Sequence, residues 1–447
     1  MTSTLPMLPR SRWLYLSLIW IGMNASVAVA QRPRYPLEYP PKLPDGQTVV
    51  VDTSDDFLTP GPNLREGVAI AKTAPKVEFQ YYPQQNYPGN PWCFRAVGTV
   101  YKGKYYSALC DHLAPLGTAY LFEYDPATQQ FRLLVNTAEF LRKAGQITPD
   151  MNYTPAEVQT RIDVGSDGWL YYGTTRGSTS VTSDANVFRG EWVLRTHPES
   201  GKTEVVSAFP VAKHCILGSV LDPQRMVFYG GTASGDRKER SVRFFALDVK
   251  SGKVLKDVDG GFDRYCIFAK STGCVYWDGK KYDPETNEIT TSEAPHVRSA
   301  TVESADGKVY GTTHYVADLW EFDTKQEKLT QLGPGAVGTQ GYVASMHIDP
   351  TGRYLYYVPG AHGGATKDGT PIVQYDLKLK RAKVLAFLHK YYQQKYGYNL
   401  DGCFCSVLDP AGDKLYISWD GWREGQPRGW ESSALTVLHI PPSERQP

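Results

Sequence analysis

The sequence has almost no excess of charge of either sign, because its 447 residues carry 48 Lys and Arg against 47 Asp and Glu. Nucleic acids and anionic membrane surfaces attract strongly basic proteins, so this balance argues against both partners. The chain also lacks a Walker loop, a dinucleotide fingerprint, an HExxH motif and a GxSxG motif. Nucleotide binding and the common hydrolase mechanisms therefore find no support.

Apolar runs long enough to cross a bilayer are also missing after the first thirty residues. Residues 1–30 have the three parts of a secretory signal peptide: Arg10 and Arg12, the apolar WLYLSLIWIGM and the small-residue ASVAVA. Cleavage after Ala30 would give a secreted or periplasmic protein without membrane attachment, whereas an uncleaved signal would act as an N-terminal anchor. The proline-rich residues 31–46 are typical of an extended tether, which leaves residues 47–447 for the folded domain.

One hairpin pattern recurs seven times along the chain. Each copy has a tight turn followed by a strand with an aromatic residue at a fixed place, and these aromatics are Tyr106, Tyr171, Phe228, Tyr276, Tyr310, Tyr356 and Tyr416. A further alternating strand, often closing in Asp or Pro, follows most copies. Period-two alternation is typical of half-buried strands, and four strands repeated seven times form a propeller. The sequence therefore predicts an all-β fold, a seven-bladed β-propeller.

The seventh copy ends too close to the C-terminus to contain a fourth strand. Its third strand, ALTVLHIP, is followed by only a few residues. The segment QTVVVDT, residues 47–53, has the alternation of a strand. We expect this N-terminal strand to fill the empty place and close the ring.

Polar residues gather where the first strand of each unit begins and the second ends. Both positions lie on one face of a propeller, around its central channel, and such convergent polar groups predict a binding site. The residues expected around this mouth are His112, Arg176 and Tyr265, together with Trp92, Gln159, Arg161, His214, Arg264, His296, Arg298, His314 and His362.

Seven cysteines follow the signal peptide, and this odd number leaves at least one thiol unpaired. Cys403 and Cys405 point to the same side of one strand and cannot easily pair with each other. Their unit adjoins the one that holds Cys93 and Cys110, so one interpretation is a disulfide between units one and seven. The alternatives are a metal site formed by these thiols with His112, holding a structural divalent ion such as zinc or calcium, and inert thiols.

Several long motifs carry a resemblance to a known family. YTPAEVQTRIDVGSDGWLYYGTTRGST, KHCILGSVLDPQRMVFYGGTA and GRYLYYVPGAHGGATKDGTPIVQYD resemble secreted seven-bladed propellers of planctomycetes and related marine bacteria, over about residues 75–445. More distantly, the first two units are similar to propeller polysaccharide lyases of the ulvan lyase kind. That resemblance implies β-elimination at a uronic acid, in which an arginine neutralises the carboxylate and a base removes the adjacent proton.

The lyase resemblance implies roles for His112 and Arg176, which match the base and the carboxylate-binding arginine by position. The chain also departs from the lyase pattern at two places. Where such lyases have a second histidine, this chain has Trp92 or Cys93, and where they have a tyrosine, it has Gln159 or Thr160. Tyr265 or His214 from neighbouring units are the candidates to replace them.

Three functions are consistent with these residues. The first is a secreted lyase for an acidic polysaccharide, with His112 as base, Arg176 and Arg298 binding carboxylate or sulfate, and Tyr265 as acid. The second is a non-catalytic propeller that binds a glycan or a partner with the same residues. The third is a metal or redox protein built on the four cysteines near His112.

Overall fold

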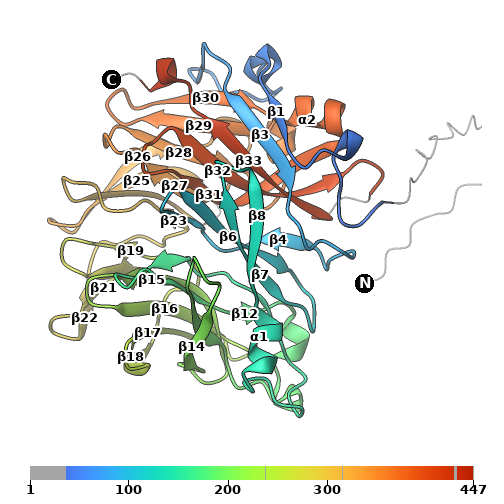
Figure 1. Ribbon diagram of the computed structural model, residues 1–447. Helices are drawn as coiled ribbons and strands as arrows, with labels where there is room; N and C mark the ends of the chain where they lie inside the picture. The colour runs from blue at the N-terminus through green and yellow to red at the C-terminus, as the bar shows by residue number, and fades with distance from the viewer. Residues whose placement is uncertain (1–36, 237, 315, 427–429, 446–447) are drawn as a thin grey trace, which may run out of the picture. The chain divides into compact units, whose positions relative to one another are not determined.

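The computed structural model describes residues 37–236, 238–314, 316–426 and 430–445. The expected signal peptide and residues 31–36 of the expected tether lie outside the described residues. The described chain forms seven sheets of four or five strands, which follow one another along the sequence (Figure 1). The prediction of a seven-bladed β-propeller is confirmed.

The first three blades contain residues 92–259. Blade one consists of β4 (Trp92–Phe94), β5 (Thr99–Tyr101), β6 (Lys104–Asp111), β7 (Ala119–Asp125) and β8 (Gln130–Asn136). Blade two has a four-stranded sheet of β10 (Asp163–Val164), β11 (Leu170–Gly173), β13 (Trp192–Thr196) and β14 (Thr203–Ala208), and β9 (Pro155–Glu157) and β12 (Thr175–Arg176) form a separate two-stranded sheet within it. Blade three consists of β15 (His214–Asp222), β16 (Val227–Ser234), β17 (Val242–Asp248) and β18 (Lys253–Asp259).

The next three blades contain residues 267–387. Blade four consists of β19 (Ile267–Phe268), β20 (Val275–Trp277), β21 (Lys280–Asp283) and β22 (Glu288–Thr291). Blade five consists of β23 (Ser299–Ala300), β24 (Lys308–Thr313), β25 (Val316–Asp323) and β26 (Lys328–Pro334). Blade six consists of β27 (Val343–Ile348), β28 (Tyr354–Pro359), β29 (Pro371–Asp376) and β30 (Arg381–Phe387), with β2 (Ala69–Ile70) added in parallel to β30.

Blade seven combines both ends of the folded chain. It contains β31 (Tyr398–Leu408), β32 (Lys414–Arg423), β33 (Ser432–His439), β3 (Lys76–Tyr81) and β1 (Val50–Asp52). The strand beside β33 is β3, and β1 pairs only with the outer edge of β3 (Figure 1). The prediction that residues 47–53 occupy the fourth place is therefore wrong. Val77 and Phe79 of β3 are fully buried, whereas Val51 is 52% exposed, so only β3 supplies the apolar face that this place requires.

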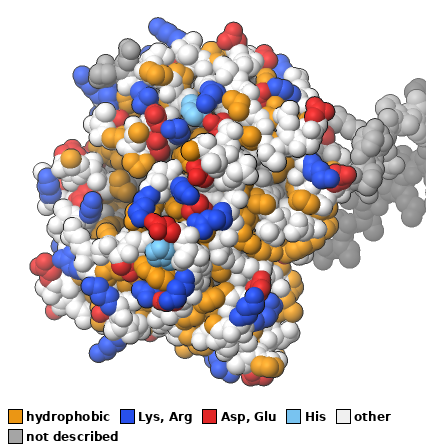
Figure 2. All heavy atoms as spheres, in the orientation of Figure 1, with side chains coloured by type: hydrophobic (Ala, Val, Ile, Leu, Met, Phe, Trp, Pro, Cys, Tyr) orange, Lys and Arg blue, Asp and Glu red, His pale blue; other side chains and the backbone are white. Residues whose placement is uncertain are grey.

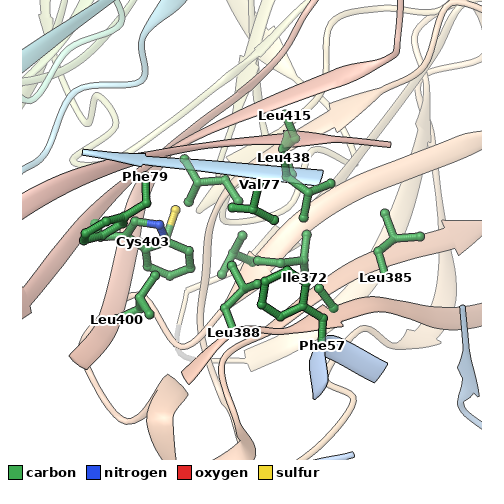
Figure 3. Close-up of a cluster of buried hydrophobic side chains, with 14 of the residues drawn as sticks. Phe57, Val77, Phe79, Ile372, Leu385, Leu388, Leu400, Cys403, Leu415 and Leu438 are labelled. Atoms are coloured by element: carbon green, nitrogen blue, oxygen red, sulfur yellow. The ribbon is translucent and has the colours of Figure 1, made fainter. Parts of the chain in front are cut away.

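The blades are held together mainly by apolar side chains between neighbouring sheets. All seven repeat aromatics are buried, as expected for side chains packed between blades. Figure 3 shows one such cluster between blades six and seven, where Val77, Ile372, Leu385, Leu415 and Leu438 converge. The first and last strands of the domain thus share one core.

Short helices lie outside the sheets. They are α1 (Thr137–Lys143), α2 (His389–Tyr396) and the 3-10 turns η1 (Pro44–Gly46), η2 (Asp55–Leu58), η3 (Thr179–Val181), η4 (Asp184–Asn186), η5 (Ala365–Asp368) and η6 (Pro442–Glu444). Among the described residues, none of these helices has the length and apolar character needed to span a membrane. Positive and negative side chains are interspersed over the face shown in Figure 2, in keeping with the balanced composition.

Candidate functional site

All seven blades contribute residues to one cavity of about 400 Å³, which we call the arginine cavity. The structure brings seven of the predicted site residues to this cavity, and they are His112, Gln159, Arg176, Arg264, Tyr265, Arg298 and His362. Arg95, Glu157, Tyr342 and Phe404 also line it. Most of these residues lie at or near the starts and ends of the first two strands of their blades, which is why residues far apart in the sequence meet there.

Positive charge dominates the lining of the arginine cavity. Four arginines line it, namely Arg95, Arg176, Arg264 and Arg298. Glu157 is the one acidic side chain among its described lining residues, and this carboxylate is fully buried. Electrostatic interactions are stronger in such a partly desolvated space than in bulk water. The lining therefore favours an anionic ligand.

Glu157, His112 and Arg95 form a chain of hydrogen bonds at one side of the cavity. The Glu157 carboxylate binds His112 Nδ1 and also accepts a bond of 2.6 Å from Gln159 Nε2. The guanidinium Nη2 of Arg95 lies 2.8 Å from His112 Nε2. A guanidinium only donates and a carboxylate only accepts, so we assign the proton to His112 Nδ1 and the lone pair to Nε2. Glu157 thus holds a neutral histidine with a basic nitrogen beside Arg95.

The surroundings keep the Glu157 carboxylate charged and hold the Arg95 guanidinium in place. Burial alone would raise the pKa of Glu157, but the hydrogen bond from His112 and the positive charge nearby lower the pKa below its ordinary value. The Arg95 guanidinium stacks on two aromatic rings, 4.3 Å from the centroid of Phe404 and 4.8 Å from that of Trp430. These contacts fix the plane of the guanidinium beside the imidazole.

Sequence reasoning missed Arg95, Glu157 and Phe404. Glu157 lies two residues before Gln159, and Arg95 lies two residues after Cys93. Because side chains alternate along a strand, Glu157 shares a side with the predicted substrate-binding residue Gln159, and Arg95 shares a side with Cys93 of the predicted disulfide or metal site. This alternation is the signal that could have identified both. Phe404 lies between two cysteines and faces the opposite side of their strand.

A second group of contacts surrounds Tyr342. The buried Arg298 donates through Nε to the Tyr342 hydroxyl, which lies 3.2 Å from His314 Nε2. The ring of His362 packs against that of Tyr342, with centroids 4.4 Å apart. Burial and then the positive charge of neighbouring arginines lower the pKa values of His314 and His362 to about 4. Both imidazoles are therefore neutral near pH 7 and serve as hydrogen-bonding or stacking groups.

Tyr265 connects the arginine cavity to a half-buried ion pair. Its hydroxyl accepts a hydrogen bond from Arg161 Nη1, and Arg161 Nε lies 2.9 Å from Asp163 Oδ1. Burial raises the pKa of Tyr265, so the phenol is protonated near neutral pH. Arg161 lines a different cavity of about 680 Å³, which Tyr265 and Val97 share with the arginine cavity. Arg161 therefore reaches the site through Tyr265 and does not line the arginine cavity itself.

Arg176 is held at the rim by groups on the neighbouring blade. Its Nη1 lies 2.8 Å from Cys215 Sγ and 3.5 Å from the Ser234 carbonyl. The fully buried carboxyl group of Glu191 interacts with the Arg176 charge and accepts a hydrogen bond of 2.8 Å from Thr174. The Arg176 guanidinium therefore lies close enough to the buried Glu191 carboxyl group to interact with it electrostatically.

Glu191 makes stability depend on pH. Burial raises its pKa from 4.5 to about 8, although hydrogen bonds from Tyr153 and Thr174 oppose the shift. An acid with a raised pKa in the folded chain contributes stability that is complete below the unfolded pKa and is lost as pH rises through the folded value. We expect Glu191 to lower the free energy of unfolding by about 1.4 kcal/mol per pH unit between about pH 5 and pH 8, and Glu191→Gln to remove this fall. Urea unfolding of both proteins measures the difference, and identical pH dependences would contradict it.

Five predicted substrate-binding residues do not line the arginine cavity, and besides Arg161 and His314 they are Trp92, His214 and His296. Trp92 is fully buried, and its indole N–H donates to the Tyr87 carbonyl at 3.0 Å, so the prediction that it contacts a substrate is wrong. Both sides of β4 are buried, and the Trp92 ring packs in the apolar cluster between blades one and seven, away from the cavity. His214 is buried with Nδ1 2.9 Å from Thr232 Oγ1. His296 pairs with Asp278, outside the arginine cavity.

The predicted disulfide between units one and seven is also wrong. All seven cysteines are described, and all are buried and free. Cys93 and Cys110 lie opposite each other on β4 and β6, while Cys405 Sγ accepts a hydrogen bond from the Gly98 N–H at 3.3 Å. In the described part of the chain, no group of three or more His, Cys, Asp or Glu residues could hold a metal ion, so the predicted site of these thiols with His112 does not form. Inert buried thiols are the remaining interpretation.

This state of the cysteines is directly measurable. Burial raises the pKa of every one of the thiols, which makes them poor nucleophiles in the folded protein. We expect a thiol reagent to label none of the seven in the native protein and all seven after unfolding without a reductant. Five labelled thiols in the unfolded protein would indicate one disulfide and contradict this assignment.

Comparison with known proteins shows the fold of this chain but not its family or its activity. No protein-family model matches the chain, and no curated protein matches it in sequence. Two solved oligogalacturonate lyases are similar in structure. The lyase from Vibrio parahaemolyticus has a TM-score of 0.50 and 10% identity, over 89% of this chain and 99% of the lyase. A lyase in complex with manganese has a TM-score of 0.51 and 11% identity, over 90% and 98%. U3-55K has a TM-score of 0.48 and 10% identity, over 81% and 98%.

Proposed function

We propose that this protein is an exported polysaccharide lyase that cleaves a uronic-acid-containing polymer by β-elimination. The observation that carries the proposal is the chain Glu157–His112–Arg95, in which a neutral imidazole has its lone pair 2.8 Å from a guanidinium at a cavity lined by four arginines. Similarity in fold to oligogalacturonate lyases supports the same class of reaction.

The pairing of His112 with Arg95 suits the chemistry of a uronate. The proton to be removed lies on C5, directly next to the carboxylate, so the base and the carboxylate-binding cation must be neighbours. In this proposal Arg95 transfers its hydrogen bond from His112 Nε2 to the substrate carboxylate, and the released lone pair takes the proton. The C4–O bond then breaks, a C4–C5 double bond forms, and Arg95 stabilises the enolate charge on the way.

Other groups at the cavity complete the proposed reaction. Tyr265 supplies the proton to the leaving oxygen, because its raised pKa keeps it protonated and Arg161 orients its hydroxyl. Arg176, Arg264 and Arg298 offer further positive charge for carboxylate or sulfate groups of the polymer.

A bound metal is not part of this proposal. Manganese is bound in one of the structurally similar lyases. The residues here do not fit such an ion, because no described group of three or more His, Cys, Asp or Glu could hold it and the cavity is lined by guanidinium groups that repel cations.

A non-catalytic glycan-binding protein is the second candidate function. Two hydrogen bonds favour it. Arg95 donates to the His112 nitrogen that would act as the base, and Arg161 donates to the Tyr265 hydroxyl that would act as the acid. If these bonds persist when a glycan is bound, the cavity holds an acidic sugar without removing a proton.

The decisive experiment incubates the chain from Gln31 with a panel of uronate-containing polysaccharides. A lyase produces unsaturated uronates, which are recorded by ultraviolet absorbance. We expect one member of the panel to give this signal in proportion to enzyme concentration. Silence on every member, with an acidic glycan still retained in a pull-down, would overturn the lyase and support the binding protein.

A further inference from the structure

A second cavity of about 450 Å³ adjoins the arginine cavity at Tyr342 and His362, which line both. Residues 339–342 form one wall, and the glycine-rich residues 360–367 form the other. We call this space the loop cavity. A ligand that fills the arginine cavity can extend into it past the two shared rings.

The walls of the loop cavity are tied together by a buried carboxylate. Asp368 is 2% exposed and accepts hydrogen bonds of 2.9 Å from the Thr339 N–H and of 2.8 Å from Asn63 Nδ2. Gly360 and Gly364 have φ values of 97° and 88°, a backbone region that glycine adopts without strain. The loop cavity is therefore a preformed site and not a gap between mobile loops.

The polar groups that line the loop cavity are matched to an anion. Gln340 is 6% exposed, its Oε1 accepts a bond of 3.1 Å from the Gly338 N–H, and its Nε2 has no partner among the described residues. A buried donor without a partner is unfavourable unless a ligand uses it. Lys367 is exposed and makes no ion pair with any described residue. No acidic side chain is among the described lining residues.

We infer that the loop cavity is a second subsite, in which Lys367 and Gln340 hold the carboxylate or sulfate of the sugar next to the one in the arginine cavity. The identity of the polymer rests on the proposed function. The inference adds that the recognised substrate carries negative charge on adjacent sugars, so affinity rises from a single sugar to an oligomer that reaches both cavities.

Calorimetric titration with uronate oligomers of increasing length tests this subsite. His112→Ala serves as the background, because it prevents cleavage during the titration. We expect Lys367→Gln to weaken binding of the longer oligomers about three- to tenfold and to leave the shortest unchanged. Gln340→Glu retains the acceptor for Gly338 but adds a negative charge, so it should weaken the longer oligomers further. The matched control is Lys378→Gln, an exposed lysine on the β29–β30 turn of the same blade.

Two oligomer series separate the possible anions, one with carboxylates only and one that also carries sulfate esters. If the Lys367→Gln and Gln340→Glu variants lose affinity only for the longer oligomers of one series, the result supports the subsite and identifies the anion that it binds. Equal losses at every length, or none for Lys367→Gln, would overturn the subsite alone. Failure of every oligomer to bind would overturn both proposals, whereas length-dependent binding without any unsaturated product from the wild-type chain would overturn only the lyase. Thermal melting of each variant verifies that it is folded.

Discussion

Replacing His112 by alanine is expected to lower kcat on the cleaved polymer about 10²- to 10⁴-fold, which is the usual contribution of a general base. The imidazole is held by the Glu157 carboxylate and presents its Nε2 lone pair next to Arg95, so no neighbouring group replaces it. Glu157→Gln should cost less, about 10- to 100-fold, because an amide oxygen still accepts from Nδ1 but lacks the charge that stabilises the imidazolium. Initial rates of ultraviolet absorbance give both values.

The matched control for this pair is His197→Ala. His197 lies on the turn between β13 and β14, with Nδ1 3.2 Å from Ser200 Oγ. Its replacement should leave the rate unchanged. An unchanged rate for His112→Ala, or an equal loss in the His197 variant, would remove His112 from the role of base and leave the binding function as the better account of the cavity.

Replacing Arg95 by lysine is expected to lower kcat/KM about 10²- to 10³-fold on a free uronate, since lysine lacks the planar fork that binds a carboxylate through two hydrogen bonds. Lysine also loses the stacking on Phe404 and Trp430 that orients the guanidinium. On a substrate whose carboxylates are methyl esters, the loss should be much smaller, because no full charge remains to be neutralised. The comparison of both substrates measures what Arg95 does to the carboxylate.

Arg353→Lys provides the control for Arg95. Arg353 directly precedes β28 and binds Asp376 with Nη2–Oδ2 at 2.7 Å, away from the arginine cavity. Its replacement should not alter either substrate's kinetics. Equal losses on the free acid and the ester in Arg95→Lys would show that Arg95 acts by holding His112 in place and not by neutralising the carboxylate.

The two candidate functions differ in whether the hydrogen bond between Arg95 and His112 breaks when a glycan binds. In the structure, Arg95 donates to the same nitrogen of His112 that would accept the proton. A substrate carboxylate that attracts Arg95 away from His112 both binds the substrate and activates the base, which would couple recognition to catalysis. A glycan that leaves this bond intact is bound and released unchanged.

The sequence by itself determined the seven-bladed propeller, because each hairpin is encoded within one contiguous stretch. Turn, aromatic and period-two alternation recur seven times, and this local pattern needs no knowledge of distant contacts. The same repeat places the start of the first strand and the end of the second strand of every unit on one face of the propeller. His112, Arg176 and Arg298, which lie near such positions, line one cavity.

Only the tertiary structure decided which distant residues meet. The choice of β3 over residues 47–53 beside β33 depends on which strand has a fully apolar side, and both candidates alternate. The free state of Cys93 and Cys405 depends on side-chain directions that the spacing of cysteines does not contain. The contact of Glu157 with His112 joins two blades, and the unpartnered amide of Gln340 depends on how its loop packs. Such contacts arise from packing between blades, which a local pattern does not encode.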